Sequence, residues 1–161
     1  MKLCNSEIIK RIKALDEEKR RILGEESTNC TTKYQKEFDL IDLGYDFNAT
    51  RKAVEGINRE VIKLKHALNV ANATVSVPEF DMTIGECIVY MAQLTAEKRV
   101  VESMSMTPAK TRATTYGGVI EYTVANYDIG ECKQKLNDIN ETICKLQVSI
   151  DRVNLSHTIE I

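Results

Sequence analysis

The chain has 161 residues, of which 43% are hydrophobic and 29% are charged, and its formal net charge at pH 7 is -2. This balance is ordinary for a soluble protein and excludes a grossly basic nucleic-acid-binding protein, so any binding of polyanions must come from a local patch. The length predicts one domain over residues 1–161, with a core large enough to fold without a metal ion or a disulfide.

The N-terminal segment and the cysteines indicate the compartment. The segment MKLCNSEIIKRIKAL has charges throughout, and no run in the chain approaches the roughly 18 apolar residues of a transmembrane helix. The five cysteines contain no C-x-x-C pair, which favours reduced thiols. We therefore expect a cytoplasmic protein without a transmembrane segment.

The first predicted helix covers about residues 6–23. A serine at its start can cap it, and its apolar residues recur every three or four positions. Gly24 is expected to end it, because glycine is common just after a helix C-terminus. Residues 25–44 lack helical periodicity and predict a connector, in which Phe38 and Leu40 alternate as in a short strand.

Two apolar ladders are the strongest structural signal. One covers about residues 47–72 and the other begins after about residue 128, and both alternate at spacings of three and four. Each stretch of about 25 residues forms a helix roughly 37 Å long that is too amphipathic to stand alone in water. Because the ladders match in length, we expect these two helices to pack against each other along their full seams. The seam residues are Phe47, Thr50, Val54, Ile57, Val61, Leu64, Leu68 and Ala71, and Ile129, Cys132, Leu136, Ile139, Ile143, Leu146, Ile150 and Val153.

Between the ladders the sequence predicts a third helix and a hairpin. The helix opens with the capping box Thr83-x-x-Glu86 and ends before Pro108. At about residues 110–125, Gly117-Gly118 separates two short segments, as in a β-hairpin whose turn needs positive φ. The last residues, HTIEI, are compatible with a short terminal strand.

These elements predict a mainly α fold, in which three to four long helices form an antiparallel bundle with a small β-hairpin insertion. Small residues beside both seams let further helices approach, which favours a bundle over a two-stranded coiled coil. These small residues are Ala53, Ala67, Thr142 and Ser149.

The sequence contains no arrangement typical of catalysis, cofactor binding or metal binding. His66 and His157 are separated by most of the chain, and neither has a second ligand three or four residues away. There is no Walker motif, GxGxxG loop or Ser-His-Asp arrangement. We therefore expect no metal and no cofactor, and we favour a non-enzymatic protein.

A basic stripe on the second helix, opposite its apolar seam, is one candidate surface. It is either a solvated face or a site for a polyanion or an acidic partner, since an array of cations gains affinity by releasing counterions. Its residues are Arg51, Lys52, Arg59, Lys63, Lys65 and His66.

Tyrosines and cations near the hairpin are a second candidate surface. They either pack the hairpin onto the bundle, which we favour, or form an interaction surface. These residues are Tyr116, Tyr122, Tyr127, Lys110 and Arg112.

Cys144 and Val148 predict a self-association surface on the outer side of the fourth helix, where a monomer is expected to place charge. An apolar strip there is explained by a second subunit, or by the hairpin and tail folding over it. We expect a homo-oligomer.

Two segments, REVIKLKHALNVANA (59–73) and KLQVSIDRVNLSHTIEI (145–161), resemble the septicolysin-like family of uncharacterised bacterial helical proteins. The family's name implies a cytolysin, although the predicted hairpin is too short to span a membrane.

Three functions therefore stay open. The favoured one is a non-enzymatic helical assembly or protein-interaction module with no specific nucleic-acid partner. A membrane-active, toxin-like protein is implied only by the family name, and polyanion binding would use the basic stripe. An enzyme with a site built across subunits has no support from individual residues.

Overall fold

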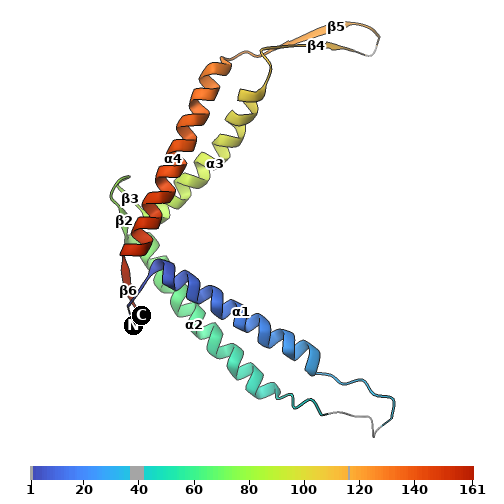
Figure 1. Cartoon of the computed structure of the whole chain (residues 1–161), viewed down its shortest axis with the longest axis vertical. Coiled ribbons are helices and arrows are strands. Elements are labelled where there is room, and N and C mark those ends of the chain that lie inside the picture. The colour runs from blue at the N-terminus through green and yellow to red at the C-terminus, as the bar shows by residue number, and fades with distance from the viewer. Residues whose placement is uncertain (1, 37–41, 116) are drawn as a thin grey trace. The chain divides into compact units, whose positions relative to one another are not determined.

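The computed structural model describes residues 2–36, 42–115 and 117–161. This described part is mainly helical, with four helices and small antiparallel strand pairs (Figure 1), which confirms the mainly α class and the hairpin insertion. The chain divides into two compact units, Met1–Thr74 with Asn154–Ile161, and Val75–Val153. The single domain and its helical bundle stay predictions. The strand expected around Phe38 and Leu40 lies outside the described residues.

The first unit is built on a helical hairpin of α1 (Asn5–Asn29) and α2 (Phe47–Thr74). The apolar stripes predicted on both helices meet in one cluster, because each helix has only this face to remove from water. Its buried members are Ile8, Leu15, Ile57 and Leu64, and the partly buried residues packed on them are Leu3, Ile12, Ile22, Val61, Leu68 and Ile159.

The prediction that Gly24 ends the first helix is wrong, since α1 continues to Asn29. A glycine inside a helix costs only about 0.5–1 kcal/mol, which neighbouring contacts can offset. Here Arg21 pairs with Glu25 one turn later, and the hydroxyl of Thr28 donates to the carbonyl of Gly24. The connector to α2 is therefore shorter than expected.

The chain termini pair with each other in the same unit. Strand β1 (Lys2–Cys4) runs antiparallel to β6 (Thr158–Glu160), with Leu3 opposite Ile159. This confirms the terminal strand expected from HTIEI, whereas β1 was not predicted. Beside it, Asn5 Nδ2 donates to Asn154 Oδ1 (3.0 Å), and Asn5 is fully buried.

The second unit contains α3 (Ile84–Met106), most of α4 (Ile129–Ser156), and the short strands β2 (Ser76–Val77) and β3 (Met82–Thr83). Strands β2 and β3 pair antiparallel and lead into α3. Its core consists of Val77, Ile84, Cys87, Leu94, Ile139, Leu146 and Ile150.

Both helices of this unit start with side-chain caps. The capping box predicted for α3 is confirmed, because the Glu86 amide donates to Thr83 Oγ1 (3.2 Å) and the Thr83 amide donates to Glu86 Oε2 (2.7 Å). At α4, the amides of Gly130 (2.6 Å) and Glu131 (3.3 Å) both donate to Asp128 Oδ1. These caps satisfy backbone donors that the helices themselves leave unpaired.

The predicted pairing of the second helix with the fourth is wrong. In the first unit the seam of α2 packs on α1, and in the second unit the seam of α4 packs on α3. An apolar stripe on one helix can pack against any helix that carries a complementary stripe. Helices that are adjacent in sequence pair at a lower loop-closure entropy cost than helices far apart in sequence, such as α2 and α4. Once α1 extends to Asn29, it also matches α2 in length, which removes the reason for pairing α2 with α4.

The predicted hairpin is confirmed as β4 (Lys110–Thr114) and β5 (Ile120–Val124), which extend beyond the ends of α3 and α4 in Figure 1. Its turn uses positive φ at Gly117 (115°) and Gly118 (79°), as the sequence predicted.

Truncation of buried leucines tests the two cores separately. Leu64 on α2 is 3% exposed and Leu146 on α4 is fully buried. We expect Leu64→Ala and Leu146→Ala each to lower the free energy of unfolding by about 2–4 kcal/mol, because each leaves a cavity. Urea denaturation followed by circular dichroism measures the loss.

Each variant has a matched control two residues away on the same helix. Ile62 is 67% exposed and Val148 is 52% exposed. Their substitution by alanine should change the free energy of unfolding by less than about 0.5 kcal/mol. Equal losses at Leu64 and Ile62 would contradict the assigned face of α2.

Candidate functional site

No three described His, Cys, Asp or Glu residues gather where they could hold a metal ion. The five cysteines are free thiols, and burial raises the pKa of Cys87, because desolvation disfavours its thiolate form. Of the described helices, none is both long enough and apolar enough to cross a membrane.

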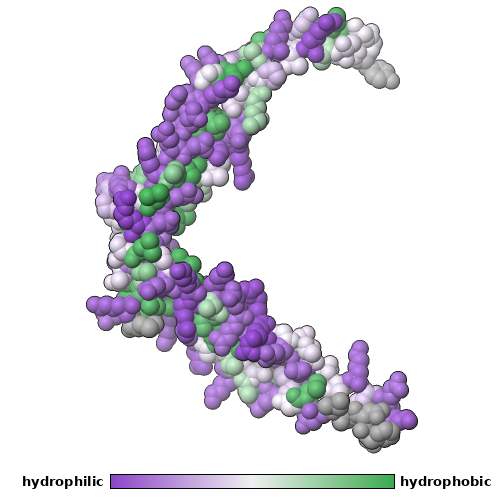
Figure 2. All heavy atoms as spheres, viewed as in Figure 1, coloured by the Kyte–Doolittle hydropathy of each residue, from purple (hydrophilic) through white to green (hydrophobic). Residues whose placement is uncertain are grey.

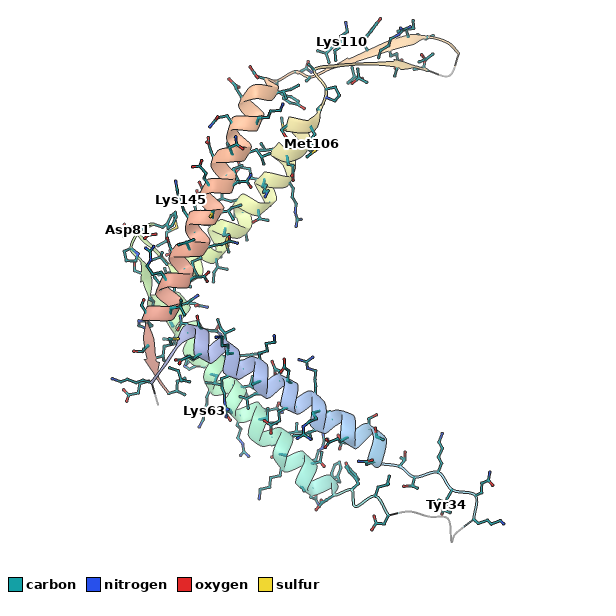
Figure 3. The ribbon with its side chains drawn as sticks, in the orientation of Figure 1. Tyr34, Lys63, Asp81, Met106, Lys110 and Lys145 are labelled. Carbon is teal, nitrogen blue, oxygen red and sulfur yellow. The ribbon has the colours of Figure 1, made fainter. Side chains whose placement is uncertain are left out.

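Most of the predicted basic stripe faces solvent on α2. Figure 3 shows Lys63 on the side of α2 away from α1. Beside it lies a depression of about 520 Å³ lined by Gly56, Arg59, Glu60, Ile62 and Lys63. Five basic residues of the stripe are exposed and form no ion pair with any described residue. They are Lys52, Arg59, Lys63, Lys65 and His66.

Arg51, the sixth residue of the predicted stripe, has a structural role instead. Its guanidinium pairs with the carboxylate of Glu26 near the end of α1, and it also lies 5.6 Å from the ring centre of Phe47. Tyr45 donates its hydroxyl hydrogen to Glu26 Oε1 (2.6 Å). These contacts hold the connector between α1 and α2 against the end of the α1–α2 helical hairpin.

The same contacts shift two ionisation equilibria. The hydrogen bond from Tyr45, followed by the bond and charge of Arg51, lowers the pKa of Glu26, although partial desolvation opposes the shift. The Glu26 carboxylate in turn raises the pKa of Tyr45, because it accepts the phenol hydrogen and repels a phenolate. Glu26 therefore stays ionised over a wider pH range when the protein is folded.

Stability at acid pH tests this contact. Because the folded pKa of Glu26 is lowered, its contribution is complete above the ordinary glutamate value of about 4.3 and is lost as pH falls through the folded value. We expect the urea midpoint of Glu26→Gln to lie below that of the wild type at pH 7. This difference should shrink as the pH falls below the ordinary glutamate value, because the carboxyl group of the folded wild type then becomes protonated.

The control is Glu55→Gln, because Glu55 is an exposed carboxylate on α2 that pairs with no described residue. The same pH-dependent difference in both variants would contradict the role assigned to Glu26.

The predicted self-association residues are both exposed on α4, and Val148 is 52% exposed. Figure 3 labels Lys145, the neighbour of Cys144, on the side of α4 away from α3. The role of Cys144 and Val148 in self-association stays a prediction.

The predicted packing of the hairpin tyrosines on the helices is wrong for Tyr122. Every residue of β4 and β5 is exposed, and Tyr122 is 57% exposed with Lys110 Nζ 4.4 Å from its ring centre. Arg112 lies directly opposite Tyr122 in the strand register. Tyr127, in contrast, donates its hydroxyl hydrogen to the carbonyl of Met104 (3.1 Å). Tyr116 lies outside the described residues.

A second apolar stripe on α3 was missed by the sequence reasoning. The inner face of α3 packs on α4, while Val89 and Val100 on another face are 61% and 60% exposed. Gln93 and Ala96 lie between them at spacings of three and four, so these four residues form one outer stripe. The signal in the sequence is that apolar residues occur on every side of this helix.

The outer stripe of α3, defined as Val89, Gln93, Ala96 and Val100, adjoins a groove of about 510 Å³. This groove is lined by Met82, Gly85, Glu86, Val89, Tyr90 and Gln93. Figure 2 shows hydrophobic residues in separate patches among the hydrophilic residues of the helices. Together, the groove and the stripe form an uncovered apolar surface on one helix.

Comparison with known proteins bears on the fold alone. No family model matches the chain, and no curated protein matches it. The crystal structure of a functionally unknown conserved protein from Corynebacterium diphtheriae is similar, with a TM-score of 0.71 and 13% sequence identity. The similarity covers 99% of this chain and 100% of that chain.

Proposed function

We propose that the protein is a non-enzymatic helical assembly module that associates with further copies of itself. The observation that carries this proposal is the outer stripe of α3. Exposed apolar patches on a soluble protein mark interaction sites, and a helix with a second apolar face generally has a second neighbour. In the described part of α3, this face meets no other helix of its own unit.

The outer stripe suits a second copy as its partner because the stripe carries no charge. Its four residues, Val89, Gln93, Ala96 and Val100, are apolar or neutral. Burial against the same stripe of another copy therefore sets no like charges against each other and carries no desolvation cost for a charge.

Such a pair also accounts for the helical bundle expected from the sequence. Two α3–α4 hairpins joined through their outer stripes form a four-helix arrangement, in which α3 is covered on both faces. We therefore propose that the bundle forms between copies rather than from the four helices of one chain. A pair with twofold symmetry is the commonest form of homo-oligomer.

We also propose a family, an alternative activity and a location for the protein, each from its sequence alone. Segments 59–73 and 145–161 support membership of the septicolysin-like family by resemblance alone. The membrane-active alternative is supported only by that family's name. A cytoplasmic location is proposed from the composition of the chain.

Light scattering on size-separated protein tests the assembly. The wild type at micromolar concentration is expected to exceed the monomer mass of 18.2 kDa. Val89→Lys with Val100→Lys should weaken association at least tenfold, or by about 1.4 kcal/mol, because the pair would bury unpaired ammonium groups.

Two controls make this experiment specific. Ile62→Lys places the same charge at an exposed apolar site on α2 and should leave the mass unchanged. Val148→Lys shows whether α4 contributes to the interface, as the sequence predicted. A wild-type mass that stays at 18.2 kDa even at about 100 μM protein would overturn the proposal.

Polyanion binding is a second candidate function, favoured by the five basic residues of α2 that pair with no described residue. Each phosphate or sulfate neutralised by a cation releases a counterion, so affinity falls steeply with salt. Lys52→Gln with Lys63→Gln should reduce the slope of log affinity against log salt for heparin by about 2. The charge-matched control is Lys133→Gln with Lys145→Gln on α4. Equal effects of the two pairs would show that only net charge matters.

A further inference from the structure

The open edge of β5 carries an inference beyond the outer stripe. Hydrogen bonds at both ends of the hairpin establish which backbone groups face inwards, because the Ala125 amide donates to the Ala109 carbonyl (3.1 Å) and the Thr115 amide donates to the Val119 carbonyl (2.9 Å). In an antiparallel pair, residues whose amide and carbonyl groups point towards the partner strand alternate with residues whose amide and carbonyl groups point away from it. In β5 the residues whose backbone groups point away, here called the outward residues, are Ile120, Tyr122 and Val124.

These outward residues are poorly protected against pairing with another strand. Their side chains are 46%, 57% and 53% exposed and lie on one face of the ribbon. A two-stranded ribbon that packs on nothing is only marginally stable in water, and an open strand edge is a template for another strand. The outward positions of β5 carry no charge and no proline, which are the usual means of blocking an edge.

The edge of β4 is different. Its outward residues are Lys110, Arg112 and Thr114, which lie opposite Val124, Tyr122 and Ile120 in the register. If β4 paired with β4 of a second copy about a twofold axis at Arg112, the two guanidinium groups would lie directly opposite each other, which is destabilising. The charges therefore block self-pairing at one edge of the hairpin and leave the other edge free.

We propose that β5 pairs antiparallel with β5 of a second copy about a twofold axis at Tyr122, so that two hairpins form one four-stranded sheet. In this register Tyr122 lies opposite its own counterpart, and Ile120 lies opposite Val124 of the other copy. Every outward amide and carbonyl of these three residues then has a backbone partner. On the opposite face, Glu121 lies beside Thr123, so no like charges meet.

This inference deepens the proposed function and rests on its requirement for a second copy, but it uses a different surface. A copy with two self-complementary surfaces, the outer stripe of α3 and the β5 edge, binds two neighbours. Association can then continue beyond a dimer unless the symmetry closes. The two surfaces can be tested independently.

Disulfide trapping tests the pairing in the full chain with the exposed Cys30 and Cys144 both changed to serine. In the proposed sheet the Cα atoms of residue 122 in the two copies lie about 5.5 Å apart, within the range for a disulfide. Tyr122→Cys should therefore form a dimer of twice 18.2 kDa under mild oxidation, as seen on a non-reducing gel.

The matched control is Thr123→Cys. In the proposed sheet, residue 123 of one copy lies opposite residue 121 of the other. The Cα atoms of residue 123 in the two copies are therefore offset by two residues and lie about 8 Å apart, which is too far for a disulfide. We expect at least tenfold less dimer than with Tyr122→Cys. Oxidation of a mixture of Ile120→Cys and Val124→Cys should give mostly mixed dimers, which checks the register.

The outcomes separate this inference from the proposed function. If Tyr122→Cys forms no more dimer than Thr123→Cys while the wild type is oligomeric, the β5 pairing is wrong and assembly through α3 can stand. If the dimer forms at full yield in the background of Val89→Lys and Val100→Lys, the β5 pairing is supported independently of the outer stripe. Mixed dimers in any other register would overturn the proposed twofold at Tyr122.

Discussion

The structure depends on one constraint, which is that a helix packed against a single partner has only one covered face. The helices α1, α2 and α4 largely fit this constraint, because each concentrates its buried residues on one stripe, although apolar residues such as Ile62 and Val148 are exposed outside it. The helix α3 does not fit it, since Val89 and Val100 remain outside the core. The excess apolar surface of α3 is therefore a property of the sequence that one α3–α4 hairpin cannot satisfy.

Polar contacts between segments set the axial register of the paired helices. The apolar stripes determine which helix faces meet, but they allow one helix to slide along the other by a turn. The ends of the first unit are fixed by the Glu26 contacts and by the bond from Asn5 to Asn154. In the second unit, Lys135 pairs with Glu97 at 3.4 Å across the two helices, although this pair is exposed and contributes little stability.

Sequence reasoning predicted the features that depend on local chemistry. The capping box at Thr83, the turn at Gly117 and the buried face of each ladder follow from hydrogen bonds and periodicity within a few residues. The partner of each ladder depends on long-range contacts that an apolar pattern does not specify. Gly24 is a local signal that failed, because a glycine weakens a helix interior only modestly and α1 continues through it to Asn29.

The candidate surfaces were predictable to a different degree. The exposure of five of the six basic residues in the stripe on α2 follows from the helical period. The structural role of Arg51 depends instead on Glu26, which the sequence had assigned to a connector. The outer stripe of α3 was visible only as an excess of apolar residues. The exposure of Tyr122 could not be predicted, because alternation defines the two faces of a hairpin but not what covers them.

The groove beside the outer stripe is shaped by a tie between β2–β3 and α4. Glu79, in the turn between these strands, accepts hydrogen bonds from Ser149 and Arg152. The bond from Ser149 is the main cause of the lowered pKa of Glu79, with the Arg152 charge adding to it. Because the Ile84 amide donates to the carbonyl of Val75, the residue before β2 (2.9 Å), the start of α3 is fixed to the base of the same strand pair. The turn therefore positions Met82 in the groove wall, so the surface proposed for assembly depends on a charged contact on the opposite helix.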